Sequence, residues 1–207
     1  LAPNAPARLR LMTFQAEGYI HRHLLEKALE TAQAADSLAQ GEGLPELAAR
    51  AQQAAANALL TLGRLPEALE AFTDLVQTNR QLKSPRHQAQ SLVGLARVLE
   101  NLGQIGDAKA HLDDALGLLE GGGVQSATTQ AVALRHRAAI AQVEGDLPQA
   151  QSMLAEALTL ETETGNQPAL LITMSFMGEL CLRLHRPERA RRLCSDAAAG
   201  LKALGSD

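Results

Sequence analysis

Residues that could carry out chemistry are few in this chain, and they are not arranged in catalytic sets. His21 and His23 could chelate a metal ion, but Arg22 lies between them and no cysteine or carboxylate follows at ligand spacing. The run Gly121–Gly123 lacks the Lys-Ser/Thr pair that a phosphate-binding loop requires. No Ser/His/Asp or Cys/His set suited to nucleophilic catalysis is recognisable. We therefore expect no metal, no cofactor and no enzymatic activity.

The charged residues indicate solvated surfaces rather than a reactive pocket. The acidic pairs Asp113/Asp114 and Glu161/Glu163 are expected near helix ends on exposed faces, where they do not form an acid–base pair. Five arginines between positions 183 and 192 could contact nucleic acid, but no aromatic residues are interleaved with them. The net charge of −4 also disfavours binding by bulk electrostatics. We expect a solvated helix face there and no nucleic-acid partner.

Composition predicts that helices are the elements that position any site. The 207 residues include 38 Ala and 37 Leu but only one Tyr, three Phe and no Trp. Sheet proteins use more aromatic and β-branched residues, whereas Ala and Leu favour helices. No apolar run approaches the roughly 20 residues of a membrane span, and no signal peptide opens the sequence. Two cysteines do not make a disulfide framework. We expect an all-α, cytoplasmic protein without a membrane partner.

Five internal repeats fill the chain. Similar segments, such as Leu62–Ala68 and Leu102–Ala108, each end in an alanine, which we call the anchor alanine. The anchors are Ala28, Ala68, Ala108, Ala150 and Ala190, at spacings of 40, 40, 42 and 40 residues. Apolar or small residues recur four and seven positions after each anchor, and a second stripe lies sixteen, twelve and nine positions before it. This spacing predicts two helices in each repeat.

Turn and cap residues support these boundaries. Proline is tolerated in the first helical turn, and seven prolines mark predicted helix starts: Pro6, Pro45, Pro85 and Pro168 for first helices, and Pro66, Pro148 and Pro187 for second helices. Glycine stands five before the anchor in three repeats, where the chain must turn sharply. Ser84 is a predicted N-cap, and the glycines at 41, 43, 121–123 and 165 are predicted to end second helices.

This pattern resembles the tetratricopeptide repeat, in a longer form seen in bacterial regulatory proteins, with a period of about 40 rather than 34 residues. The resemblance covers nearly all of residues 9–204. It implies an all-α, right-handed α-solenoid of five helix–turn–helix repeats. They are expected at about 6–41, 45–83, 85–120, 126–164 and 168–204, in one domain of residues 1–207. The chain departs from the family pattern where a large aromatic is expected in each first helix: Met12, Gln52, Leu92, Leu134 and Met174 stand there instead.

The resemblance also implies a concave groove lined by first helices, which holds an extended peptide or a partner helix. First-helix positions off the buried stripe include Thr13, Glu17, Gln53, Gln90, Val93, Val132, Ile172 and Ser175. Other first-helix positions off the stripe carry the residues that we predict to bind the ligand: Arg10, Arg50, Asn57, Arg97, Arg135, His136, Phe176 and Glu179. Arginine suits a carboxylate, and the asparagine amide can pair with a peptide backbone. We hypothesise a groove for an acidic peptide segment, although a solvated face without a ligand is an open alternative.

Two functions are consistent with this reading. The first is a non-catalytic scaffold that binds a protein or peptide partner in its concave groove. The alternative is a regulatory, peptide-sensing domain of a larger bacterial signalling protein or transcription regulator. The last helix carries Leu193, Ala197, Leu201 and Leu204 with no polar capping helix after it, which fits either a longer parent chain or a homo-oligomer formed through this C-terminal helix.

Overall fold

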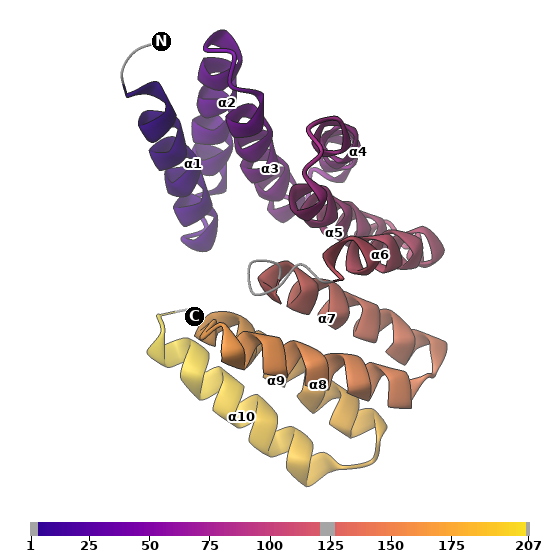
Figure 1. Ribbon diagram of the computed structural model, residues 1–207. Helices are drawn as coiled ribbons and strands as arrows, with labels where there is room; N and C mark the ends of the chain where they lie inside the picture. The colour runs from indigo at the N-terminus through magenta and orange to yellow at the C-terminus, as the bar shows by residue number, and fades with distance from the viewer. Residues whose placement is uncertain (1–3, 121–126, 206–207) are drawn as a thin grey trace. The chain divides into compact units, whose positions relative to one another are not determined.

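The computed structural model describes residues 4–120 and 127–205, which form helices joined by short turns and contain no strand (Figure 1). The all-α prediction of helix–turn–helix repeats is confirmed. The run Gly121–Gly123 lies outside the described residues. No described helix is long and apolar enough to cross a membrane. The helices in chain order are α1 (Ala5–His21), α2 (Leu25–Gly41), α3 (Pro45–Thr61), α4 (Leu65–Gln81), α5 (Pro85–Asn101), α6 (Ile105–Leu119), α7 (Ala127–Glu144), α8 (Leu147–Glu163), α9 (Gln167–Arg183) and α10 (Pro187–Ala203).

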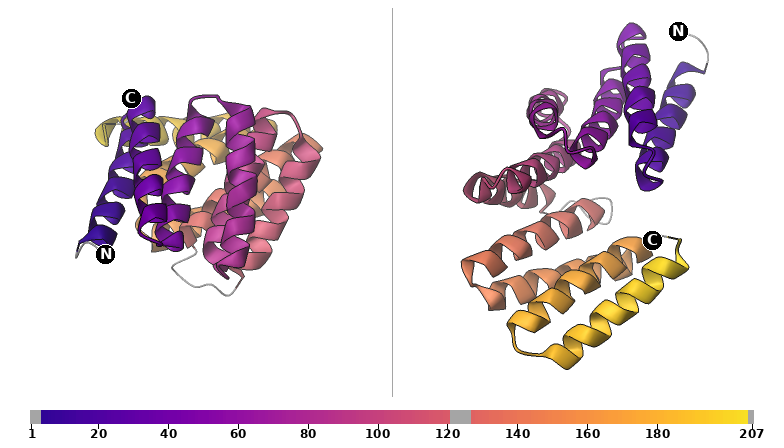
Figure 2. Two further views of the ribbon diagram at one scale, coloured as in Figure 1. Left: turned by 90° about the horizontal axis from the view of Figure 1, so that it is seen from above. Right: turned by 180° about the vertical axis from the view of Figure 1, so that it is seen from behind.

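The chain divides into two compact units, Leu1–Ala108 and Lys109–Asp207, which we call the N-terminal unit and the C-terminal unit. In the N-terminal unit, α1, α2 and α3 pack against one another, as do α3, α4 and α5. Figure 2 shows α1, α2 and α3 side by side. In the C-terminal unit, α7, α8 and α9 pack against one another, and α10 packs against α9. The grouping of all 207 residues into one domain stays a prediction.

The helices begin where the prolines predicted. Each of the seven prolines stands in the first two positions of its helix, where a backbone N–H would lack an intrahelical partner. One cap differs from the prediction. Ser84 does occupy the N-cap of α5, but its hydroxyl makes no capping bond and instead lies 2.7 Å from Nδ1 of His87. The serine is diverted because the imidazole one turn later offers a closer partner.

Positive φ recurs at the same point of every hairpin turn. The residue five before the anchor alanine has φ between 55° and 86° in all five repeats: His23, Gly63, Gly103, Gly145 and His185. In each turn the N–H of the next residue donates to a carbonyl five residues back, as from Arg64 to Leu59, which closes the end of the first helix. Glycine adopts this backbone without strain, so the prediction at three repeats is confirmed. The two histidines show that the turn geometry does not depend on glycine.

Small residues let the two helices of each repeat approach closely. The anchor alanines are 0–2% exposed, and the small residues twelve before them are all buried. Helices of successive repeats also approach closely at Gly94 on α5, where an added Cβ would lie 2.1 Å from Cε1 of Phe72 on α4. Phe72 is fully buried and has no free space to move into.

Replacing Gly94 with alanine should therefore lower the free energy of unfolding of the N-terminal unit by about 1–3 kcal/mol through overpacking. Denaturant titration measures the loss, and a second substitution, Phe72→Leu, should recover part of it. Gly18→Ala on α1 is the matched control, because nothing lies within 4 Å of its added Cβ. That control should be neutral or stabilising. Equal effects at Gly18 and Gly94 would contradict the packing described here.

Candidate functional site

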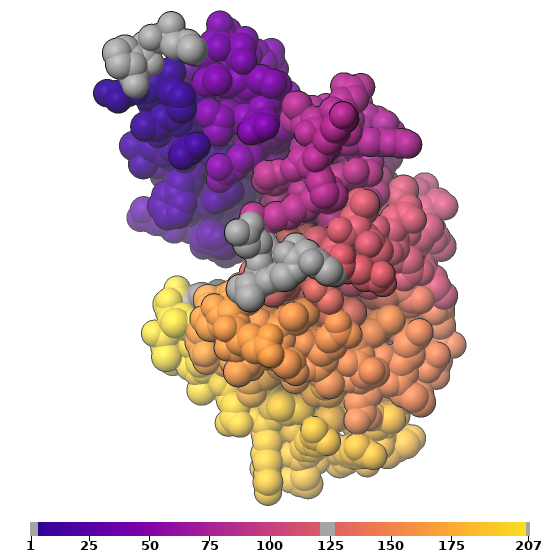
Figure 3. Space-filling view, viewed as in Figure 1, coloured from indigo at the N-terminus to yellow at the C-terminus, as the bar shows by residue number. Residues whose placement is uncertain are grey.

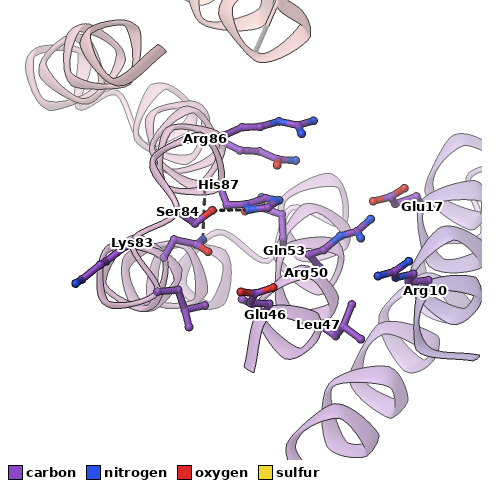
Figure 4. A pocket seen from close by; sticks show the side chains of 14 residues that line it. Arg10, Glu17, Glu46, Leu47, Arg50, Gln53, Lys83, Ser84, Arg86 and His87 are labelled. Atoms are coloured by element: carbon purple, nitrogen blue, oxygen red, sulfur yellow. Dashed lines mark hydrogen bonds between the residues drawn. The ribbon is translucent and has the colours of Figure 1, made fainter. Parts of the chain in front are cut away.

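A groove of about 570 Å³ lies in the N-terminal unit between α1 on one side and α3 and α5 on the other (Figure 4). Arg10 and Glu17 reach it from α1, and Arg50 from α3. The turn between α4 and α5 and the first turn of α5 complete the opposite wall. The remaining lining residues are Glu46, Leu47, Ala49, Gln53, Asn79, Leu82, Lys83, Ser84, Arg86, His87 and Gln90. First helices therefore supply most of the groove.

The groove is cationic although the chain as a whole is acidic. Its lining carries four permanent cations and two carboxylates, a net charge of +2, in a chain of net charge −4. None of these six side chains forms an ion pair within the described part of the chain. Their charges are left for a ligand or for solvent. Positive charges that line one concave surface attract anions and raise their local concentration.

The pKa of His87 reflects the positive charge of the groove. Burial lowers the pKa of the His87 imidazole, and the charges of Arg86 and Arg50 lower it further, with Glu46 opposing them. Its ring points from α5 toward Arg50 and Gln53 on α3 (Figure 4). The bond between Ser84 Oγ and His87 Nδ1 holds the ring in this direction. A bound anion would offset the two arginines and favour the protonated imidazole.

The lowered pKa of His87 gives the N-terminal unit a defined pH dependence. Below the ordinary value of 6.5, the unfolded chain binds a proton at His87 that the folded chain still excludes. The free energy of unfolding should therefore rise with pH between the folded pKa and 6.5, and fall on acidification through that window. Denaturant titrations over this window should show a shallower fall for His87→Gln than for the wild type. Parallel curves for the two proteins would contradict this assignment.

A buried network of three polar side chains forms the floor of the groove, and we call it the neutral triad. Asn79 on α4 donates through Nδ2 to Ser91 Oγ on α5, at 3.1 Å. Ser91 Oγ donates in turn to Gln53 Oε1 on α3, at 2.8 Å. All three side chains are at least nine-tenths buried. The network fixes the Gln53 amide, because only its nitrogen end is left to face the groove.

The same repeat positions carry a second network in the C-terminal unit, which we call the charged triad. Arg135, Glu161 and Thr173 each lie 82 residues after Gln53, Asn79 and Ser91, respectively. Arg135 Nη1 donates to Glu161 Oε1 at 2.9 Å and approaches Thr173 Oγ1 at 3.1 Å. Thr173 Oγ1 donates to Glu161 Oε1 at 3.0 Å. Burial raises the pKa of the Glu161 carboxyl, with the Thr173 bond and the Arg135 charge opposing it.

The groove of the N-terminal unit brings together two of the predicted binding residues, Arg10 and Arg50. Asn57 and Arg97 lie on the same helices, α3 and α5, but are half-buried and outside the groove lining. Burial lowers the pKa of Arg97, against the charge of Glu100. Of these four predicted residues, Arg10 and Arg50 therefore line the groove, whereas Asn57 and Arg97 lie farther along their helices and outside it.

The predicted residues of the C-terminal unit differ in exposure. Arg135 is 7% exposed and belongs to the charged triad, with its guanidinium carbon 5.9 Å from the centre of the Phe176 ring. His136 and Phe176 are half-buried, and Glu179 is exposed on α9. Glu161 was expected on an exposed face and is 1% exposed instead. It is covered because α9, on which Thr173 lies, packs against α8.

Two expected groove positions in the N-terminal unit are buried as well. Thr13 and Val93 occupy the same repeat position as Gln53 and Arg135, and both are buried. At Thr13, Val93 and Arg135 this position is covered by the next repeat, whereas Gln53 also reaches the groove. Conversely, sequence reasoning missed Arg86, His87 and Lys83, because it considered only the middle of each first helix. The cluster of basic residues from 83 to 87, directly beside a predicted helix start, was the signal that could have found them.

A family model matches part of the chain. Residues 129–203 match the family model described as tetratricopeptide repeat. That segment covers α8, α9 and α10 and almost all of α7. None of the curated proteins compared with this chain matches it in sequence.

Solved structures resemble the whole chain. BtubC (BKLC) from P. vanneervenii is 16% identical with a TM-score of 0.71, and the match covers 98% of this chain and 83% of that one. A putative kinesin light chain with nearly identical TPR-like repeats, from Podosopora anserina, is 18% identical with a TM-score of 0.64, covering 96% and 97%. NprR in complex with its cognate peptide NprX is 18% identical with a TM-score of 0.74. There the match covers 96% of this chain but only 56% of NprR. At these identities the likeness concerns the fold.

Proposed function

The chain carries tetratricopeptide repeats, and we propose that it binds an extended acidic segment of a protein or peptide in the groove of the N-terminal unit, without catalysing a reaction. The observation that supports this is the charge of the groove. It holds a net charge of +2 on side chains that form no ion pair with any described residue, in a chain of net charge −4. A ligand rich in Asp and Glu would supply the missing partners.

Each part of the groove has a role in this proposal. Arg50 and Arg10 face each other across the groove (Figure 4), so their guanidinium groups can hold carboxylates from two sides. Arg86 adds a third fork from α5. The Gln53 amide nitrogen, held in place by the neutral triad, donates to a backbone carbonyl of the bound segment. Together these groups suit an acidic side chain and an extended backbone beside it.

One of the structural relatives supports a peptide ligand. NprR binds a cognate peptide, NprX. A regulatory role, in which peptide binding alters an attached output domain, is the alternative function that this relative favours. We keep the scaffold as the main proposal because the groove charge bears on binding and not on any output.

The remaining predicted contacts extend this proposal. We place Asn57 and Arg97 along the continuation of α3 and α5 beyond the groove, where a longer segment would reach them. His136, Phe176 and Glu179 are proposed as a separate contact surface in the C-terminal unit. We also place the protein in the cytoplasm, in keeping with its two free cysteines. Self-association through α10 would leave the groove open, because no groove residue lies on that helix.

Amide-resolved NMR with an N-acetylated hexaglutamate peptide tests the site. We expect the largest shifts at Arg50, Gln53 and His87, and at the α1 residues that face them. A hexalysine peptide of the same length is the matched ligand control and should leave these signals unchanged. Shifts spread over the outer surfaces of both units, or equal shifts with hexalysine, would overturn the proposal.

A further inference from the structure

Two pairings of side chains recur where one repeat packs on the next within a unit. The first concerns the residue four after an anchor alanine and the residue fourteen before the next anchor. Phe72 lies against Gly94, Ala32 and Ala54 belong to one core cluster, and Phe176 packs against the cluster that contains Leu154. The second joins the residue eleven after an anchor to the residue seventeen before the next: Ala39 with Ala51, Asn79 with Ser91, and Glu161 with Thr173. These pairings define the stacking interface of the repeats.

Helix α1 presents one half of this interface, and the described residues leave that half exposed. Leu11 and Phe14 stand seventeen and fourteen before the first anchor, and they are 56% and 71% exposed. At the first of these positions the other four repeats carry residues that are all 0% exposed: Ala51, Ser91, Ala133 and Thr173. The other repeats therefore bury the position of Leu11 completely, and they bury or half-bury the position of Phe14.

Helix α10 presents the other half. Cys194 stands four after the last anchor and is exposed, and Leu201 stands eleven after it and is half-buried. The residues equivalent to Cys194 in the other repeats are 0% exposed: Ala32, Phe72, Leu112 and Leu154. Leu204, at the end of α10, is also 49% exposed. Both α1 (indigo) and α10 (yellow) contribute to the surface in Figure 3.

We propose that α10 of one copy of this chain docks on the outer face of α1 of a second copy, which continues the repeat stacking from chain to chain. The sizes of the residues are complementary. Phe14 would meet the small Cys194, in the same pairing in which the large Phe72 meets Gly94 with the roles reversed. Leu11 would meet Leu201, an apolar pair like Ala39 with Ala51. Leu11 and Phe14 do not line the groove, although Arg10 and Glu17 of the same helix do, so the contact itself uses no groove residue.

Hydrogen bonding also selects the α10 end for this contact. If Leu11 took the place of Ser91 or Thr173, Gln53 or Arg135 would lose the hydroxyl partner that it has now. The equivalent residue beside α10 is Ser175, whose hydroxyl donates to the carbonyl of Leu171 in its own helix, at 3.2 Å. Thr13 satisfies itself in the same way at the apolar contact between the first two repeats. An apolar residue can therefore cover Ser175 without orphaning it.

Sedimentation velocity on the full chain tests the proposal with two variants. Each variant keeps one of the two contact surfaces, the α1 face or the α10 end, and blocks the other. Leu11→Lys with Phe14→Lys blocks α1. Leu182→Lys with Leu204→Lys blocks the α10 end, because Leu182 on α9 stands eight before the last anchor, where the second and fourth repeats bury Leu60 and Gln142. All four side chains are exposed, so both variants should fold. The wild type should associate progressively from roughly 5 to 500 µM, because each head-to-tail dimer still has a free α1 face and a free α10 face. Each variant alone should stay at 21.9 kDa, and a 1:1 mixture should form a dimer of twice that mass.

The control is Val143→Lys, which removes a side chain that is 72% exposed, at a repeat position that is exposed in all five repeats. It should associate like the wild type. A wild type that stays monomeric throughout overturns the proposal and leaves the α1 face for a helix of another protein. A mixture of the two variants that stays monomeric, or an α10 variant that still associates, overturns it as well. Loss of association in Val143→Lys would place the contact elsewhere.

Discussion

Arg135→Ala should lower the free energy of unfolding of the C-terminal unit by about 3–5 kcal/mol. Arg135 supplies the cation for Glu161, which is 1% exposed. Its Oε2 already has no hydrogen-bond partner within the described residues. Removing the guanidinium leaves a buried carboxylate with only Thr173 to satisfy it. A loss of this size is a large part of the about 5–15 kcal/mol that stabilises a typical domain.

Native-state hydrogen exchange measures this effect in one unit at a time. Amides of α7, α8 and α9 should exchange faster in the variant, while those of the N-terminal unit stay unchanged and serve as an internal reference. Arg192→Ala is the matched control, because Arg192 is an exposed arginine of the same unit with no ion pair. That control should change stability by less than about 0.5 kcal/mol.

The neutral triad suggests a rescue. The double substitution Arg135→Gln with Glu161→Asn recreates the Gln53–Asn79 pair at equivalent positions and leaves Thr173 in the place of Ser91. It should recover most of the stability that Arg135→Ala loses. A double variant no more stable than Arg135→Ala, or a loss below about 1 kcal/mol for the single substitution, would contradict the role assigned to the charged triad.

Acidification should shrink the loss caused by Arg135→Ala. Burial raises the pKa of Glu161, so between the unfolded and the folded value the folded chain binds the extra proton. Stability contributed by this group therefore falls as pH rises through that window. Without Arg135 the folded pKa should rise further, which makes the variant's deficit larger at neutral pH than near the ordinary value of 4.5. A deficit independent of pH would indicate that Glu161 is not buried as a carboxylate.

The second large effect concerns the groove. Reversing two of its cations, Arg50→Glu with Arg86→Glu, should weaken the binding of an acidic peptide by about 100-fold or more, because both carboxylate forks become repulsive. Binding should also weaken with salt in the wild type, since the groove is open to solvent. Fluorescence anisotropy with labelled hexaglutamate measures both effects.

The control carries the same change in charge at a different place. Arg22→Glu with Arg80→Glu also takes the chain from −4 to −8, and both arginines are exposed and outside the groove. If net charge alone governs binding, the two double variants will weaken it equally. The groove account requires the control to keep most of the wild-type affinity.

Much of the fold could be predicted because the repeat period is carried by local residue types. Proline in the first turn of a helix and small residues at crossings are constraints that act within a few residues of sequence. The turn at His23 could still be placed, because the period carries information from the glycine-containing repeats to those without glycine. Ser84 occupies the predicted N-cap position, but its hydroxyl makes no capping bond, because it pairs with a nearby imidazole that a cap preference does not consider.

The site was harder to predict because each first helix has three kinds of face: one against its hairpin partner, one against the next repeat and one toward the groove. The sequence pattern separates the first of these from the other two, but it does not separate those two from each other. A stripe of apolar residues marks the contact within a hairpin, but the off-stripe positions divide between the groove and the next repeat. Arg135 and Thr13 belong to the second class, and Arg50 and Arg10 to the first. One sequence signal marked the positions that contact the next repeat. Three polar residues, of which Gln53 is the first, recur as polar residues 82 positions later, where Arg135 is the first.

Selection from a random peptide library tests the central claim most directly. Peptides of about nine residues, which span about 30 Å when extended, would be selected against the wild type and against Arg50→Glu with Arg86→Glu. The account predicts that Asp and Glu are enriched in the peptides that the wild type retains, and that this enrichment disappears in the variant. Wild-type peptides without acidic enrichment, or the same acidic peptides retained by both proteins, would contradict it.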